Sequence, residues 1–224
     1  MKRIALSILL FVFMAVPASA GLSLGLDRHG GYYQGDGGEF TIDPLGFEWV
    51  LGLYHDDAKY GDDAFQSFCV ERSETVNIPG TYDAVLNDAA VEGSEGSGNS
   101  DPLSKGTAWL YHEFQKGTLT GYDYDTSGDR AADAEKLQNV IWYLEEEITS
   151  APSNEFATLV TTKFGDWTEA RKDNAGTYAV GVLNLTKNGQ LKQDMLVCIP
   201  APGAMLLGSI GVALVGFLRR RRAV

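Results

Sequence analysis

The sequence lacks the local motifs that mark the common classes of enzyme. It contains no G-x-S-x-G, no H-E-x-x-H and no Gly-rich phosphate loop. Its histidines His29, His55 and His112 are too scattered to form a metal site. Paired acids such as Asp56-Asp57 are too frequent to single out a glycosidase. We therefore expect a protein that is not an enzyme.

Long hydrophobic runs are also missing. The apolar run at Met205–Leu218 has 14 residues, whereas a transmembrane helix needs ~20. The run at Ile4–Val16 follows Lys2 and Arg3 and precedes the cleavage pattern Ala18-Ser19-Ala20, which is the order of a secretory signal peptide. We expect cleavage after Ala20 and export of the remaining chain.

The C-terminal segment has three parts in a fixed order. Pro200, Ala201 and Pro202 come first, then the apolar run, then four arginines. Basic flanks stay on the cytoplasmic side, so the residues before Pro200 are expected outside. The arginines of this basic stop are Arg219, Arg220, Arg221 and Arg222.

This layout resembles the PEP-CTERM sorting signal of bacterial surface proteins, with Ala201 where that motif has glutamate. The resemblance implies a short transmembrane segment within residues 199–224 and processing by an exosortase-type transpeptidase. It also implies a membrane-anchored precursor that passes to the cell surface or extracellular matrix. A plain membrane anchor is the alternative.

Basic residues are scarce in the segment between the two signals, residues 21–198. Six of the 18 Lys and Arg lie in the signals, whereas none of the 30 Asp and Glu does, so this ectodomain has 12 basic and 30 acidic residues, a net charge of −18. Such a surface repels nucleic acid and anionic membranes. We expect no nucleic-acid partner.

There are only two cysteines, Cys69 and Cys198. In an exported protein such a pair normally indicates a disulfide. Cys198, however, directly precedes the sorting motif, where we expect a stalk, whereas Cys69 lies in an expected core strand over Phe65–Val70. A disulfide, a buried free thiol and a reactive thiol all remain open for Cys69.

A second resemblance concerns the reactive alternative. Phe68-Cys69-Val70, followed by Leu137-Gln138-Asn139-Val140-Ile141-Trp142, is similar to the paired motifs of bacterial thioester adhesin domains. Leu137 and Val140 stand where that family has Thr and Ala. The resemblance implies a Cys69–Gln138 thioester, walled by Phe68 and Trp142, that couples covalently to amines or hydroxyls on a surface.

An acidic turn is the remaining candidate site. Asp123, Asp125, Ser127 and Asp129 are spaced as in the first half of a calcium-binding loop, but position twelve is Ala134 instead of an acid. A solvated acidic turn is the alternative. Calcium is the one cofactor that the sequence suggests.

The periodicity predicts a mainly β, α+β fold. Alternating segments up to Leu86 and again at Tyr178–Leu185 and Met195–Ile199 indicate strands, including a hairpin over Glu71–Leu86. Helical spacing over Leu103–Phe114, Asp133–Ile148 and Glu155–Phe164 indicates helices. We therefore expect a β-sandwich or barrel with a helical insertion around residues 103–164.

Taken together, these patterns favour an exported adhesive protein of the cell surface or matrix. Its partners would be the sorting transpeptidase, the membrane during sorting, and either a matrix polysaccharide or a surface amine. The alternative is a non-covalent structural or carbohydrate-binding protein in which the Cys69 and Gln138 pair is inert.

Overall fold

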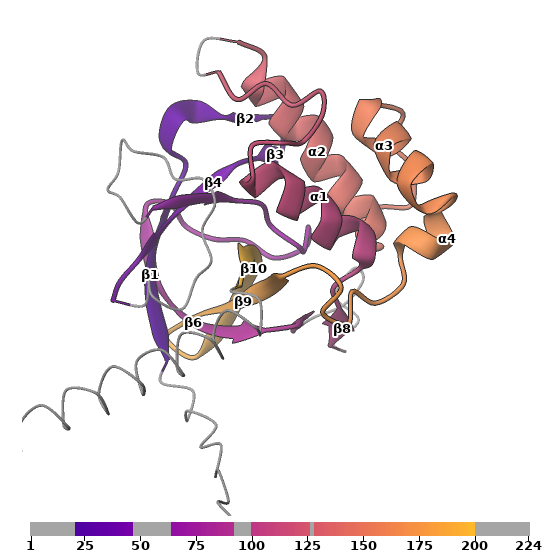
Figure 1. The fold of residues 1–224 in the computed structure, drawn as a ribbon. Coiled ribbons are helices and arrows are strands. Elements are labelled where there is room, and N and C mark those ends of the chain that lie inside the picture. Colours follow the sequence, from indigo (N-terminus) through magenta and orange to yellow (C-terminus); the bar gives the residue numbers. More distant parts are fainter. Residues whose placement is uncertain (1–20, 47–63, 92–99, 126–127, 200–224) are drawn as a thin grey trace, which may run out of the picture.

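The computed structural model describes residues 21–46, 64–91, 100–125 and 128–199. Within them the fold is mainly β, with one six-stranded antiparallel sheet curled into a half-barrel and helices packed along one side (Figure 1). The expected mainly β, α+β class is therefore confirmed. The two expected signals at the chain ends, and the sorting motif, lie outside the described residues.

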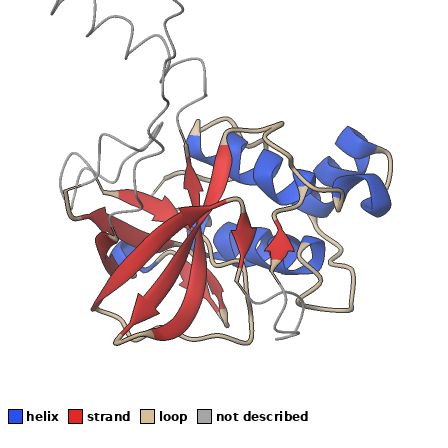
Figure 2. Cartoon of the chain, turned by 90° about the horizontal axis from the view of Figure 1, so that it is seen from below, coloured by secondary structure: helices blue, strands red, loops and turns tan. Residues whose placement is uncertain are grey.

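The sheet has the order β10-β9-β6-β1-β4-β5. Its strands, seen as the curled red arrows in Figure 2, are β1 (Leu22–Asp27), β4 (Phe40–Pro44), β5 (Phe65–Ser67), β6 (Gly80–Asn87), β9 (Val180–Lys187) and β10 (Gln190–Cys198). Two short ribbons complete the β structure: β2 (Tyr33–Gln34) with β3 (Gly37–Gly38), and β7 (Ala89–Ala90) with β8 (Asp101–Pro102).

The curl brings the two outer strands of the sheet together. Directly after β5, the N–H of Val70 donates to the carbonyl of Asp194, and the N–H of Leu196 in β10 donates to the carbonyl of Phe68. Between them Cys69 forms a bridge with Met195. The chain thus places Cys69 where the first and last strands of the sheet meet.

The helical insertion extends a little beyond the expected range. Its elements are α1 (Lys105–Gln115), α2 (Arg130–Leu144), α3 (Glu155–Phe164) and the short α4 (Trp167–Ala170). Ser104 and Asn154 begin α1 and α3 by accepting hydrogen bonds from Thr107 N and Ala157 N. The expected helices therefore exist, with α4 as an addition.

The expected hairpin over Glu71–Leu86 is wrong. Only β6 forms there, beginning at Gly80, and it pairs with β1 and β9 instead of with a partner from 71–79. The preceding residues run as a loop whose Asn77 hydrogen-bonds to the Tyr82 hydroxyl through both its N–H and its carbonyl. Local alternation of Thr, Val and Ile identified β character but not the strand that would pair with it.

Two apolar clusters form the core. The sheet cluster lies on one face of the curled sheet and takes one helical side chain, Trp142 of α2. The helix cluster lies between the other face and the helices, and contains Leu137, Val140 and Ile141 of the same helix. Helix α2 therefore contributes side chains to both clusters, and this position is what brings it to Cys69.

A cysteine and a glutamine at the closure of the sheet

Cys69 points into the sheet cluster, where it is 1% exposed. Its neighbours Phe68 and Val70 point the other way, into the helix cluster, because successive side chains of an extended chain alternate between faces. The Phe68 ring packs edge-on against Phe114, with 5.0 Å between centroids. The structure therefore does not bring Phe68 to the thiol as the wall that the resemblance implied.

Gln138 reaches the same point from α2. It is completely buried, and Trp142 follows it by four residues, so both side chains project from one side of the helix. The ribbon of β2 and β3 packs over this part of α2 (Figure 1). A Cβ on Gly37 would lie 3.0 Å from Gln138 Cβ and Cγ, tighter than ordinary van der Waals contact, so glycine favours this close approach of the ribbon.

Three hydrogen bonds join the two residues. The Cys69 thiol donates to Gln138 Oε1 over 3.3 Å, and the Cys69 backbone N–H donates to the same oxygen over 3.2 Å. Gln138 Nε2 donates to the Cys69 carbonyl over 2.8 Å. The carboxamide is therefore held in one orientation, with its oxygen toward the thiol and the backbone N–H.

The thiol is in its protonated form at neutral pH. Burial raises the pKa of Cys69 to about 12, while Trp142 and then the more distant Arg28 lower it less strongly. Trp142 is only 3% exposed, and its buried indole N–H has no hydrogen-bond partner. It lies close enough to the thiol to favour the thiolate. A water-poor site thus holds a thiol, a fixed carboxamide and an uncommitted donor.

Cys198 is not on a stalk, which corrects the expectation from its place in the sequence. It is the last residue of β10, is fully buried, and points into the helix cluster. Burial raises the pKa of Cys198 to about 12. Cys69 and Cys198 are both free thiols in separate clusters, so the disulfide alternative is not the arrangement found here.

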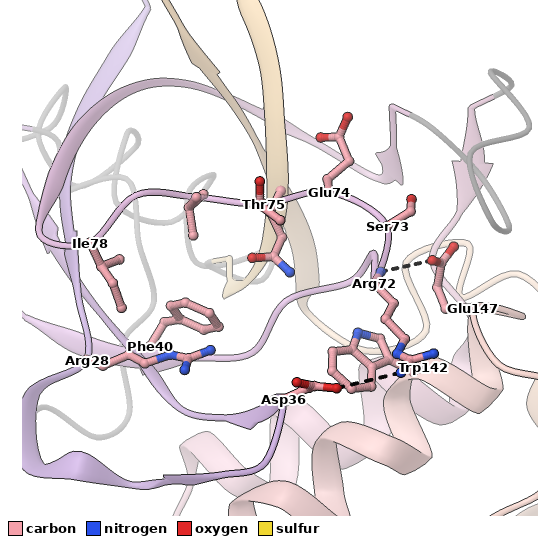
Figure 3. Close-up of a pocket in the computed structure, with 12 residues that line it drawn as sticks. Arg28, Asp36, Phe40, Arg72, Ser73, Glu74, Thr75, Ile78, Trp142 and Glu147 are labelled. Carbon is pink, nitrogen blue, oxygen red and sulfur yellow. Dashed lines mark hydrogen bonds and ion pairs between the residues drawn. The ribbon is translucent and has the colours of Figure 1, made fainter.

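A cleft of about 710 Å³ lies on the far side of Trp142 (Figure 3). Its walls come from the loop after Cys69, the β2–β3 ribbon and the residue after β1. Arg72 stacks over the Trp142 ring at 5.7 Å and pairs with Asp36 at 3.7 Å. Its lining residues are spread along the chain from Arg28 to Gln193, so no local pattern in the sequence predicts this cleft.

The acidic turn is organised by its own backbone. Asp123 accepts the N–H groups of Asp125 and Asp129 on its two carboxylate oxygens, and Asp133 accepts the N–H of Asp123. Ser127 lies outside the described residues. Across the described ranges, no three His, Cys, Asp or Glu side chains converge as metal ligands. Calcium stays a prediction from sequence spacing.

Comparison with protein-family models, with curated proteins and with solved structures found no match. Both family resemblances therefore rest on the motifs quoted above. In the part of the chain that the structure describes, no helix has the length and apolarity needed to cross a bilayer.

Proposed function

We propose that this chain is an exported surface or matrix protein that attaches covalently to its target through a Cys69–Gln138 thioester. The observation that carries the proposal is the contact of the Cys69 thiol with Gln138 Oε1, at 3.3 Å between two fully enclosed side chains. The two residues lie far apart in the sequence, so it is the fold that brings them into contact. The similarity of both segments to thioester adhesin motifs supports the same chemistry.

Bond formation balances without an external reagent. The Cys69 sulfur attacks Gln138 Cδ, the C–N bond breaks, and the thiol proton leaves with the amide nitrogen as ammonia. The Cys69 N–H already donates to Gln138 Oε1, where negative charge develops during the attack. Thiolate is the reactive form, and the free N–H of Trp142 is placed to stabilise it.

The thioester then reacts once, when the protein couples to its target. An amine or hydroxyl of the target attacks the thioester carbonyl, the acyl group passes to the target, and Cys69 is released as a thiol. The bond survives until that event because water is kept from a site in which both residues are buried. This is single-turnover attachment, and the protein is not an enzyme.

The intact mass of the purified ectodomain tests the thioester. We expect a mass about 17 Da below that of the sequence, and about 14 Da above it after methylamine has opened the bond. Cys69→Ala should show neither change, whereas Cys198→Ala should show both. An unmodified mass with two titratable thiols would reject the thioester and leave a non-covalent structural or carbohydrate-binding protein.

Export and sorting form the second part of the proposal. The signal-peptide pattern before Gly21, the Pro200-Ala201-Pro202 motif and the terminal arginines support it. Mature protein isolated from its native host should therefore lack the peptide with Arg219 to Arg222, as read by C-terminal mass mapping. Recovery of that peptide from membrane-embedded protein would indicate a plain anchor instead.

A further inference from the structure

The cleft beside Trp142 contains an arginine without an acidic partner. The Arg28 guanidinium lies 4.5 Å from the Phe40 ring centre and 4.6 Å from that of Tyr33. No carboxylate among the described residues forms an ion pair with it, and its buried Nε has no hydrogen-bond partner. In a chain with 30 acids and 18 bases, a cation left unpaired in a cleft is an unusual feature.

The acids around the cleft do not neutralise Arg28. Asp36 pairs with Arg72, and Glu147 accepts the backbone N–H of Arg72 over 2.9 Å. Glu74 also lines the cleft, from the loop that carries Arg72. Figure 3 shows the Arg28 side chain running beneath Phe40 with its guanidinium toward the interior of the cleft. Its free N–H groups are therefore available to a ligand.

We propose that this cleft binds a carboxylate-bearing sugar of an acidic polysaccharide, with the carboxylate on Arg28. Arginine binds carboxylates through paired N–H donors, and its contacts with two rings fix its orientation. The volume of about 710 Å³ is in the range of small-ligand sites. Ser73, Thr75 and Gln193 add polar groups for sugar hydroxyls.

The position of the cleft gives this binding a role in attachment. Trp142 separates the cleft from Cys69, so a sugar bound there presents hydroxyls on the far side of a single side chain from the reactive pair. This role depends on the proposed function, whereas the binding itself does not. Recognition would therefore persist in a Cys69→Ala variant that cannot couple.

The charges of the ectodomain and of the cleft favour binding of the ligand through short-range contacts and not through long-range attraction. The net charge of the ectodomain repels a polyanion at a distance, and physiological salt screens that repulsion beyond a Debye length of ~8 Å. Within the cleft, the Arg28 guanidinium is partly enclosed by rings, where screening is weaker. We expect binding at physiological ionic strength and weaker binding at low salt.

Calorimetric titration with a short oligogalacturonate tests the site. The affinity of the Arg28→Gln variant should be weaker by about tenfold or more, because a charge-assisted contact is removed. Arg171→Gln is the matched control, since Arg171 also stacks on a ring, Tyr143 at 4.2 Å, away from the cleft. The methyl-esterified oligomer and poly-glutamate serve as the uncharged and the peptide ligands.

The outcomes separate this site from the thioester. Loss confined to Arg28→Gln, with weak binding of the esterified oligomer and of poly-glutamate, supports the proposal. Equal binding of the esterified oligomer, tighter binding of poly-glutamate, or no binding of any oligomer overturns it. The same titrations in Cys69→Ala, with intact masses recorded in parallel, report on the thioester independently.

Discussion

The Gln138→Glu variant should have no thioester and should couple to no target. A carboxyl group keeps the shape of the carboxamide, so its oxygen can still accept the Cys69 N–H. It has no amide nitrogen to release as ammonia, however, so the bond-forming step proposed for Gln138 is not available to it. The expected result is the unmodified sequence mass for the variant, a free Cys69 thiol, and no response to methylamine.

The same variant should lose stability as the pH rises. The introduced carboxyl would be fully buried, and burial already raises the pKa of Glu145, at the end of the same helix, to about 7. Its folded pKa would exceed the ordinary unfolded value of about 4.3. Stability is therefore kept below that value and falls as the pH rises through the folded pKa, by about 2–4 kcal/mol at pH 8.

Gln115→Glu is the matched control for this experiment. Gln115 is 1% exposed, and its amide nitrogen donates to the Tyr111 hydroxyl, whereas the amide of Gln138 is bonded to Cys69. The control should show a similar pH-dependent loss in urea unfolding while keeping the lowered mass and the methylamine reaction. A lowered mass in Gln138→Glu would show that another residue is the acyl donor.

Local periodicity was enough to predict most elements of the fold. Glu155–Phe164 is a helix over the expected range, and α2 carries the expected apolar spacing at Leu137, Val140 and Ile141. These signals succeed because a helix depends on residues three or four apart. The apolar pattern from Phe65 likewise predicts buried extended chain, and Cys69 does lie in the core.

Features that depend on distant pairing could not be read from the sequence. The position of Cys198 just before the sorting motif predicts a stalk, yet β10 pairs with β9 up to this residue. The contact of Gly37 with Gln138 and the unpaired state of Arg28 depend on how the ribbon and strands pack against α2. No local spacing encodes such approaches, so only the structure could find the cleft.

One buried ion pair connects these distant parts. Glu39, between β3 and β4, accepts hydrogen bonds from Arg130 Nε at 2.7 Å and from Arg130 Nη2 at 2.8 Å. The Arg130 guanidinium also lies 3.8 Å from the Tyr32 ring centre. Burial opposes its charge, yet the bonds to Glu39 raise the pKa of Arg130 above its ordinary value. The pair fixes the ribbon that covers Gln138 to the start of α2.

Glu39→Leu should therefore destabilise the fold and reduce thioester yield together. Removing one partner of a buried pair leaves the other charge uncompensated and costs about 3–5 kcal/mol. The double variant Glu39→Leu/Arg130→Met should recover much of the stability, because no charge is left buried. Glu169→Ala breaks only the exposed pair with Lys172 and should cost less than about 1 kcal/mol.

Urea unfolding and intact mass, measured on the same samples, distinguish the two effects of that pair. If the ion pair promotes thioester formation by holding the ribbon over Gln138, the double variant should regain stability but not full thioester yield. The reason is that it lacks the directional hydrogen bonds that orient the ribbon. Full yield in the double variant would mean that apolar packing of β2 and β3 on α2 is enough. Unchanged stability in Glu39→Leu would contradict the buried pair itself.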